Sequence, residues 1–138
     1  MTTPYKPILC LDFDGVIHSY VSGWKGAATI PDPPVDGAMA FIERAMNHFR
    51  VAIFSSRSNQ EGGLQAMKDY MLGNMGLYLA ATYGQPEAVG AIAMVNDFLE
   101  WPTEKPAAFV TIDDRALTFD GTWPDVAALK EFKPWNKR

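Results

Sequence analysis

Residues 7–15 read Pro-Ile-Leu-Cys-Leu-Asp-Phe-Asp-Gly, an apolar run that ends in two acids and a glycine. A short, continuous apolar run bounded in this way is typical of a strand buried on both faces of a parallel sheet. Asp12 and Asp14 stand two residues apart, and side chains at this spacing in a strand point to the same side. We therefore predict a buried strand over residues 7–11 with a pair of acids at its carboxyl end.

Two further apolar runs, at residues 51–54 and 107–112, are also followed by polar side chains. Between and after these runs, apolar residues recur at helical spacing. This spacing predicts helices over residues 35–49, from Asn59 or Gln60 to Met71, from about Pro86 to Leu99 with the proline in the first turn, and from Asp125 to Phe132. The alternation of strands and helices predicts an α/β fold with a mainly parallel sheet.

Capping residues and glycines mark the expected boundaries. Asp36 is the predicted N-cap of the first helix, and Gly73, Gly76 and Gly84 are predicted to break the chain before the third. Residues 17–34 are rich in Gly, Pro, Ser and aromatic side chains and show no period, which predicts an irregular flap. With 138 residues and no repeat or linker, the chain is expected to form a single domain over residues 1–138.

Composition narrows the function classes. The net charge is −4 and no cluster of Lys and Arg is present, which disfavours nucleic acid held by bulk charge. Cys10 is the single cysteine, the first residues do not resemble a signal peptide, and the longest apolar stretch, residues 88–95, is too short to cross a bilayer. We expect a cytoplasmic protein with no membrane partner.

The polar clusters after the three apolar runs are expected to meet, because the carboxyl ends of parallel strands form the ligand-binding edge of a sheet. Asp12, Asp14 and the Asp113–Asp114 pair would then lie close together. Packed carboxylates repel one another unless a cation lies between them, and Mg²⁺ prefers oxygen ligands of this kind. The sequence thus predicts a magnesium site that leaves room for a substrate phosphate.

Taken in order, these residues resemble the four motifs of the haloacid dehalogenase-like hydrolase superfamily. The matching stretches are Asp12-Phe-Asp-Gly-Val16, Ser55, Lys105 and Asp113-Asp114, so that the resemblance spans residues 8–115. It implies a Rossmann-like, three-layer α/β/α fold with a mainly parallel sheet. Since residues 15–35 hold only the flap, and residues 57–104 are filled mostly by the crossover helices that the sheet needs, it also implies a member with a minimal cap or none.

The resemblance implies a Mg²⁺-dependent phosphomonoesterase that works through an aspartyl-phosphate. Asp12 would be the nucleophile, and Asp14 would protonate the leaving oxygen and then activate water. The carboxylate of Asp12, the backbone carbonyl of Asp14 and an acid of the Asp113–Asp114 pair, with Asp113 favoured, would hold Mg²⁺. The predicted phosphate-binding residues are Ser55, Ser56 and Lys105.

Several neighbouring residues have more than one possible role. His18 and Trp24 in the flap are candidates for contact with the substrate. Arg57 and Arg115 would either bind phosphate or pair with nearby acids. Cys10, inside the first apolar run, is expected to be a buried, inert thiol. Lys68, in the middle of a predicted helix, is expected to be a surface lysine.

Two alternatives to a phosphatase stay open: a catalytically weak binding module of the same fold, and a phosphoacceptor domain of receiver type. The order of the acids argues against the receiver, in which an acid pair ends the first strand and the acceptor ends a later one. The expected substrate is a phosphorylated small molecule or a nucleic-acid end. A site with so little cap is also one that a homo-oligomer would complete.

Overall fold

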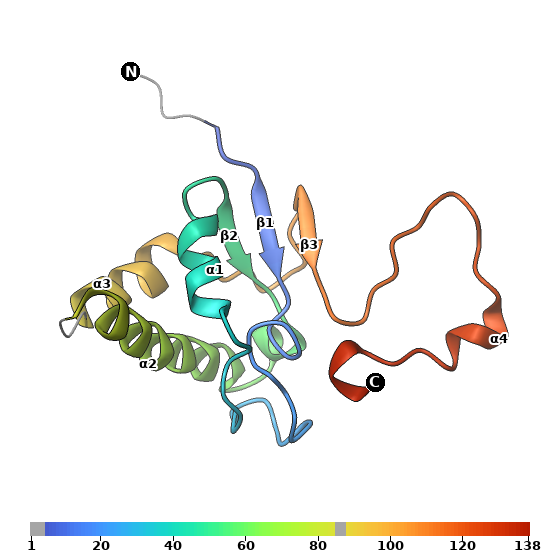
Figure 1. Ribbon diagram of the computed structural model, residues 1–138, viewed down its shortest axis with the longest axis horizontal. Helices are drawn as coiled ribbons and strands as arrows, with labels where there is room; N and C mark the ends of the chain where they lie inside the picture. Colours follow the sequence, from blue (N-terminus) through green and yellow to red (C-terminus); the bar gives the residue numbers. More distant parts are fainter. Residues whose placement is uncertain (1–4, 85–87) are drawn as a thin grey trace.

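Three parallel strands form the centre of the structure, a computed structural model that describes residues 5–84 and 88–138 (Figure 1). They are β1 (Ile8–Leu11), β2 (Arg50–Ile53) and β3 (Val110–Ile112), in the order β2-β1-β3. Each matches one of the predicted apolar runs, although β3 begins three residues later than expected. The predicted α/β class and the parallel sheet are confirmed.

The strands end in register, which determines where the polar clusters lie. Leu11 is aligned with Ile53 on one side and with Ile112 on the other. The next residues continue this alignment, since the amide of Asp12 donates to the Ile112 carbonyl at 3.0 Å and that of Phe54 donates to Leu11 at 3.1 Å. The chain therefore leaves all three strands at one edge of the sheet.

Four α-helices accompany the sheet within the described residues: α1 (Ala38–Ala45), α2 (Gly63–Tyr83), α3 (Ala88–Ala93) and α4 (Val126–Leu129). Shorter turns are η1 (Ser56–Asn59), η2 (Met94–Phe98), which has π-helical geometry and extends α3, and η3 (Trp135–Lys137). None of the helices in the described parts of the chain is long and apolar enough to span a membrane.

The core lies between β1, β2 and the helices α1 and α2. Met67, Met71 and Met75 follow one another at four-residue spacing along α2 and are fully buried, as expected for unbranched apolar side chains that fill irregular space. All three residues of β3 are exposed. A three-layer arrangement therefore stays a prediction.

Two predicted features of the helices are wrong. Helix α1 begins at Ala38 rather than residue 35, and Gly37, with φ of 83°, takes the N-cap position instead of Asp36. Helix α2 passes through Gly73 and Gly76 and ends at Gly84. A glycine costs a helix about 1 kcal/mol relative to alanine, whereas burial of a methionine side chain contributes roughly 1.5–3 kcal/mol.

Helices α3 and α4 are shorter than predicted. Pro86 lies outside the described residues, and the helix described there begins at Ala88 and runs through η2 to Phe98. Helix α4 covers four residues, and the side chain of Asp125 caps it by accepting from the Ala128 amide at 3.1 Å. Residues 17–34 contain no helix or strand, in agreement with the predicted flap.

After β3 the chain forms an extended arm, residues 116–134, which projects from the sheet and then returns (Figure 1). At its end, the indole nitrogen of Trp135 donates to the Gly15 carbonyl at 2.7 Å. The side-chain amide of Asn136 donates to the Ser19 carbonyl at 3.0 Å. These contacts, which we call the C-terminal clasp, fasten the end of the described chain to the loop that follows Asp14.

Candidate active site

Three of the predicted acids meet at the carboxyl edge of the sheet. Asp12 follows β1, and Asp113 and Asp114 follow the neighbouring β3. One carboxylate oxygen from each lies within 4.8 Å of the others, a spacing that suits ligands of one metal ion. Gly15 makes this approach feasible, because a Cβ there would collide with the Asp114 carboxylate and its φ of +82° favours glycine.

Burial and the neighbouring acids disfavour ionisation of Asp12. Burial, a hydrogen bond with the Asp114 side chain and the charge of Asp113 raise the pKa of Asp12 to about 8. Opposing these effects, the Asp12 carboxylate accepts a hydrogen bond from the Phe13 amide at 2.8 Å. A nucleophilic carboxylate must be ionised, and a cation among the three acids would favour that form. The donor set and its electrostatics thus fit a hard divalent cation.

The predicted phosphate-binding residues share a cavity with Asp12. The cavity has a volume of about 230 Å³, and its walls include Asp12, Ser55, Ser56, Lys105 and Asp113. Asp12, Ser55, Ser56 and Asp113 follow the carboxyl ends of the strands, and Lys105 comes from the loop before β3. A tetrahedral anion in this space would meet hydroxyl groups on one side and an ammonium group on another.

Ser55 is positioned by the turn that it begins. Its Oγ accepts from the Arg57 amide at 3.1 Å, and its own amide donates to the Ser58 hydroxyl at 3.1 Å. This reciprocal capping box fixes the start of η1. Since Oγ acts as an acceptor within the turn, its O–H remains available to donate to a phosphate oxygen.

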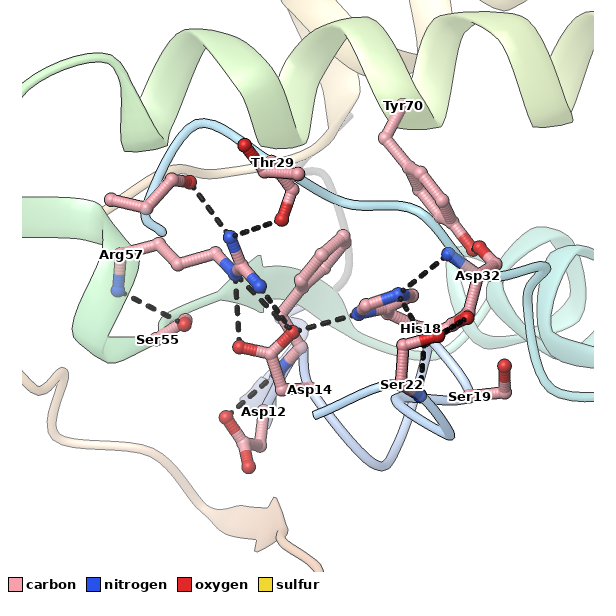
Figure 2. Close-up of polar contacts among 12 residues, drawn as sticks. Asp12, Asp14, His18, Ser19, Ser22, Thr29, Asp32, Ser55, Arg57 and Tyr70 are labelled. Carbon is pink, nitrogen blue, oxygen red and sulfur yellow. Dashed lines mark hydrogen bonds and ion pairs between the residues drawn. The ribbon is translucent and has the colours of Figure 1, made fainter. Parts of the chain in front are cut away.

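Asp14 is held by two partners on the flap side of the site (Figure 2). Its carboxylate accepts from Arg57 Nε at 2.9 Å and lies 2.8 Å from His18 Nδ1. Burial raises the pKa of Asp14, but the hydrogen bonds from His18 and Arg57 and the charge of Arg57 outweigh it, so that the pKa lies below its usual value. Asp14 and Asp12 nevertheless both line one cavity of about 150 Å³.

Arg57 forms an ion pair with an acid, the second of the two roles that the sequence left open. Its guanidinium group is fully buried. Besides Asp14, it donates to the carbonyl oxygens of Gly26, Ala27 and Thr29 at 2.8, 2.7 and 3.2 Å, and Figure 2 shows the bond to Thr29. One buried cation therefore connects the second acid of the first motif to the flap. The only signal of this role in the sequence is the position of Arg57 directly after Ser55 and Ser56.

His18 lies beneath the site instead of at its surface. The side chain is completely buried, so the expectation that it contacts the substrate is not met in this structure. Its Nε2 accepts from the Asp32 amide at 3.2 Å, and its Nδ1 lies 2.8 Å from an Asp14 oxygen.

Asp32 and Tyr70 were missed as supporting residues. Asp32 accepts from the amide and hydroxyl of Ser22 at 2.8 and 2.6 Å, and the Tyr70 hydroxyl donates to the Asp32 carbonyl at 3.0 Å. Together with His18, these contacts hold one end of the flap against α2 (Figure 2).

The remaining candidate residues lie either at the cavity that contains Asp12 and Asp14 or away from it. Trp24 and Arg115 line the cavity that contains Asp12 and Asp14, and Arg115 Nε lies 4.0 Å from an Asp114 oxygen. Cys10 is buried, and burial raises the pKa of its thiol, as expected for a structural cysteine. Lys68 lies on α2 with its ammonium group 5.8 Å from the centre of the Trp101 ring.

Comparisons of the chain with protein-family models, with curated proteins and with solved structures found no match. Any functional conclusion therefore depends on the residues and geometry described above.

Proposed function

We propose that the protein is a Mg²⁺-dependent phosphomonoesterase that forms an aspartyl-phosphate on Asp12. The observation that supports this most directly is the cavity that Asp12 shares with the phosphate-binding candidates Ser55 and Lys105. Asp12 also belongs to the cluster of three acids that could hold a metal ion. The chemistry of the groups matches phosphoryl transfer, which needs a nucleophile, donors to the equatorial oxygens and compensation of negative charge.

In the first half of the reaction, a carboxylate oxygen of Asp12 attacks the phosphorus atom. The new oxygen–phosphorus bond forms as the bond from phosphorus to the leaving oxygen breaks, and the bonding electrons stay on that oxygen. Ser55 donates a hydrogen bond to the phosphoryl group, and Lys105 balances its charge. A proton at Asp14 passes to the leaving oxygen, which departs as an alcohol.

In the second half, the Asp14 carboxylate accepts a proton from water, and the water oxygen attacks the phosphorus atom of the intermediate. The bond to Asp12 breaks, which releases inorganic phosphate and restores the nucleophile. The lowered pKa of Asp14 favours the ionised form that this step requires.

The carboxylates of Asp12 and of Asp113 or Asp114, with the backbone carbonyl of Asp14, would hold the metal ion. Bound there, Mg²⁺ would supply charge stabilisation for the transferring phosphoryl group. The excess negative charge of the three acids supports this assignment. Completion of the open site by a second copy of the chain stays a prediction.

Turnover of p-nitrophenyl phosphate tests the proposal. We expect many turnovers per protein with Mg²⁺ and none after removal of metal by EDTA, with activity restored when Mg²⁺ is added back. A single stoichiometric phosphorylation would indicate a phosphoacceptor domain instead, and no reaction with any phosphate ester would favour a binding module.

A further inference from the structure

The cavity that contains Asp12 and Asp14 has two aromatic side chains in its wall. They are Tyr20 and Trp24, both from the flap, and they stand beside Arg115 at the rim. The reaction proposed above uses the two acids but assigns nothing to the aromatic rings. The cavity, at about 150 Å³, leaves a leaving group little room except along these side chains.

Trp24 presents a ring that is already held in place. The guanidinium carbon of Arg57 lies over the ring, 4.6 Å from its centre, in a cation–π contact. Arg57 is itself fixed by Asp14 and by three flap carbonyls. Even so, Trp24 is 45 % exposed, and part of that surface faces the cavity. The ring is therefore oriented before any ligand arrives, which lowers the entropy cost of stacking on it.

Tyr20 is also positioned by the buried network. Its ring lies edge-on to that of His18, with centroids 5.8 Å apart and an interplanar angle of 73°. Its backbone adopts φ of 62°, a left-handed conformation that side chains other than glycine seldom take. This arrangement places a second ring at the wall of the same cavity.

From this arrangement we infer that the substrate is a phosphate monoester whose leaving group carries a flat aromatic ring, which stacks on Trp24. The inference depends on the proposed function for the phosphate end of the substrate. Stacking of a flat ring on an aromatic side chain contributes enough to raise affinity about tenfold. A benzene ring attached directly to the phosphate oxygen and a nucleobase separated from it by a sugar share this chemistry.

A different role for Trp24 is to cover the Arg57–Asp14 ion pair against water. Two substitutions separate the roles. Trp24→Leu keeps an apolar cover but removes the ring, whereas Trp24→Phe keeps both. If coverage alone mattered, both variants would treat aromatic and non-aromatic substrates alike.

The test measures binding by calorimetry with Mg²⁺ present, in a protein made inactive by Asp12→Asn. One matched pair of probes is phenyl phosphate and cyclohexyl phosphate, and the other is adenosine 5′-monophosphate and ribose 5-phosphate. We expect the aromatic member of at least one pair to bind about tenfold more tightly. That preference should disappear with Trp24→Leu and persist with Trp24→Phe. The pair that shows it identifies how far the ring lies from the phosphate.

Equal affinities within both pairs, or a preference that survives Trp24→Leu, would overturn the inference alone. No binding of any probe would overturn the proposed phosphate site, and the inference with it. Hydrolysis by the wild-type protein is measured separately with the same four esters. An aromatic preference in binding without hydrolysis would contradict the phosphatase proposal alone. Hydrolysis of all four esters at equal kcat/KM would contradict the aromatic-ring inference alone.

Discussion

At the scale of single residues, Lys105 is the cation that lines the cavity with Asp12 and Ser55. Substitution by alanine would leave a dianionic phosphoryl group beside three carboxylates with less positive charge. We expect Lys105→Ala to lower kcat/KM for p-nitrophenyl phosphate by about 10²–10³-fold, the order found when one preorganised donor is removed. Lys68→Ala is the matched control, because that lysine lies over Trp101 on α2. A larger loss with Lys68→Ala would show that the charge-neutralising lysine is misassigned.

Asp14 has conflicting demands. Its contacts with Arg57 and His18 favour the ionised carboxylate, which suits the water-activating step but opposes donation of a proton to the leaving oxygen. We therefore expect kcat for phosphorylation to fall as the pKa of the leaving alcohol rises, so that p-nitrophenyl phosphate reacts faster than phenyl phosphate. Single-turnover rates across substituted phenyl phosphates measure this slope. A slope of zero would mean that proton donation is complete before the bond breaks.

At the scale of elements, Arg57 fastens the flap to the end of β1. Its removal would leave Asp14 without its ion-pair partner and three flap carbonyls without a donor. We expect Arg57→Met to lower the free energy of unfolding by about 3 kcal/mol, as when one partner of a buried ion pair is lost. Urea unfolding measures the change, with Arg115→Met as the control, since Arg115 is largely exposed and 4.0 Å from its acid. Equal effects of the two substitutions would contradict the role of Arg57 in fastening the flap to the end of β1.

In helix α2, one substitution is expected to raise the stability of the protein. Gly73 lies inside the helix, and a Cβ there would have no neighbour within 4 Å. We expect Gly73→Ala to raise the free energy of unfolding by about 0.5–1 kcal/mol, because alanine loses less backbone entropy in a helix. Gly15→Ala, which places a Cβ against Asp114, should destabilise the protein instead. A destabilised Gly73→Ala protein would mean that α2 does not continue past that residue.

At the scale of the whole molecule, local patterns predicted the sheet and the acids at its edge. The apolar runs that became β1, β2 and β3 are continuous in the sequence, and strand register then brings together Asp12, Ser55 and Asp113 without further information. The ion pair between Arg57 and Asp14 and the C-terminal clasp could not be predicted in this way. They join residues 43 and 120 positions apart, and no local period encodes such pairs. The length of α2 does not follow from its glycines alone, because the burial of Met75 stabilises the helix beyond Gly73.

The C-terminal clasp connects the end of the described chain to the loop that follows Asp14. Trp135→Phe keeps a ring but removes the N–H that donates to the Gly15 carbonyl. Loss of one such hydrogen bond costs about 1 kcal/mol, so we expect kcat for p-nitrophenyl phosphate to fall about fivefold if the clasp positions the loop of Asp14. Trp123→Phe, in the exposed part of the arm, serves as the control. A lower Tm with unchanged kcat would assign the clasp to stability alone.

We propose that Asp12 carries the phosphoryl group during the reaction. The most direct test uses an Asp14→Asn protein, which is mixed with Mg²⁺ and p-nitrophenyl phosphate and then quenched in acid. Mass spectrometry of its peptides then locates any phosphoryl group. The carboxamide that replaces the Asp14 carboxylate cannot accept a proton from water, so the intermediate should accumulate. We expect a phosphoryl adduct on the peptide that contains Asp12, and no adduct when Asp12→Asn is added to the same protein. Release of p-nitrophenol with no adduct on that peptide, or an adduct at Asp113 or Asp114, would contradict the proposed mechanism.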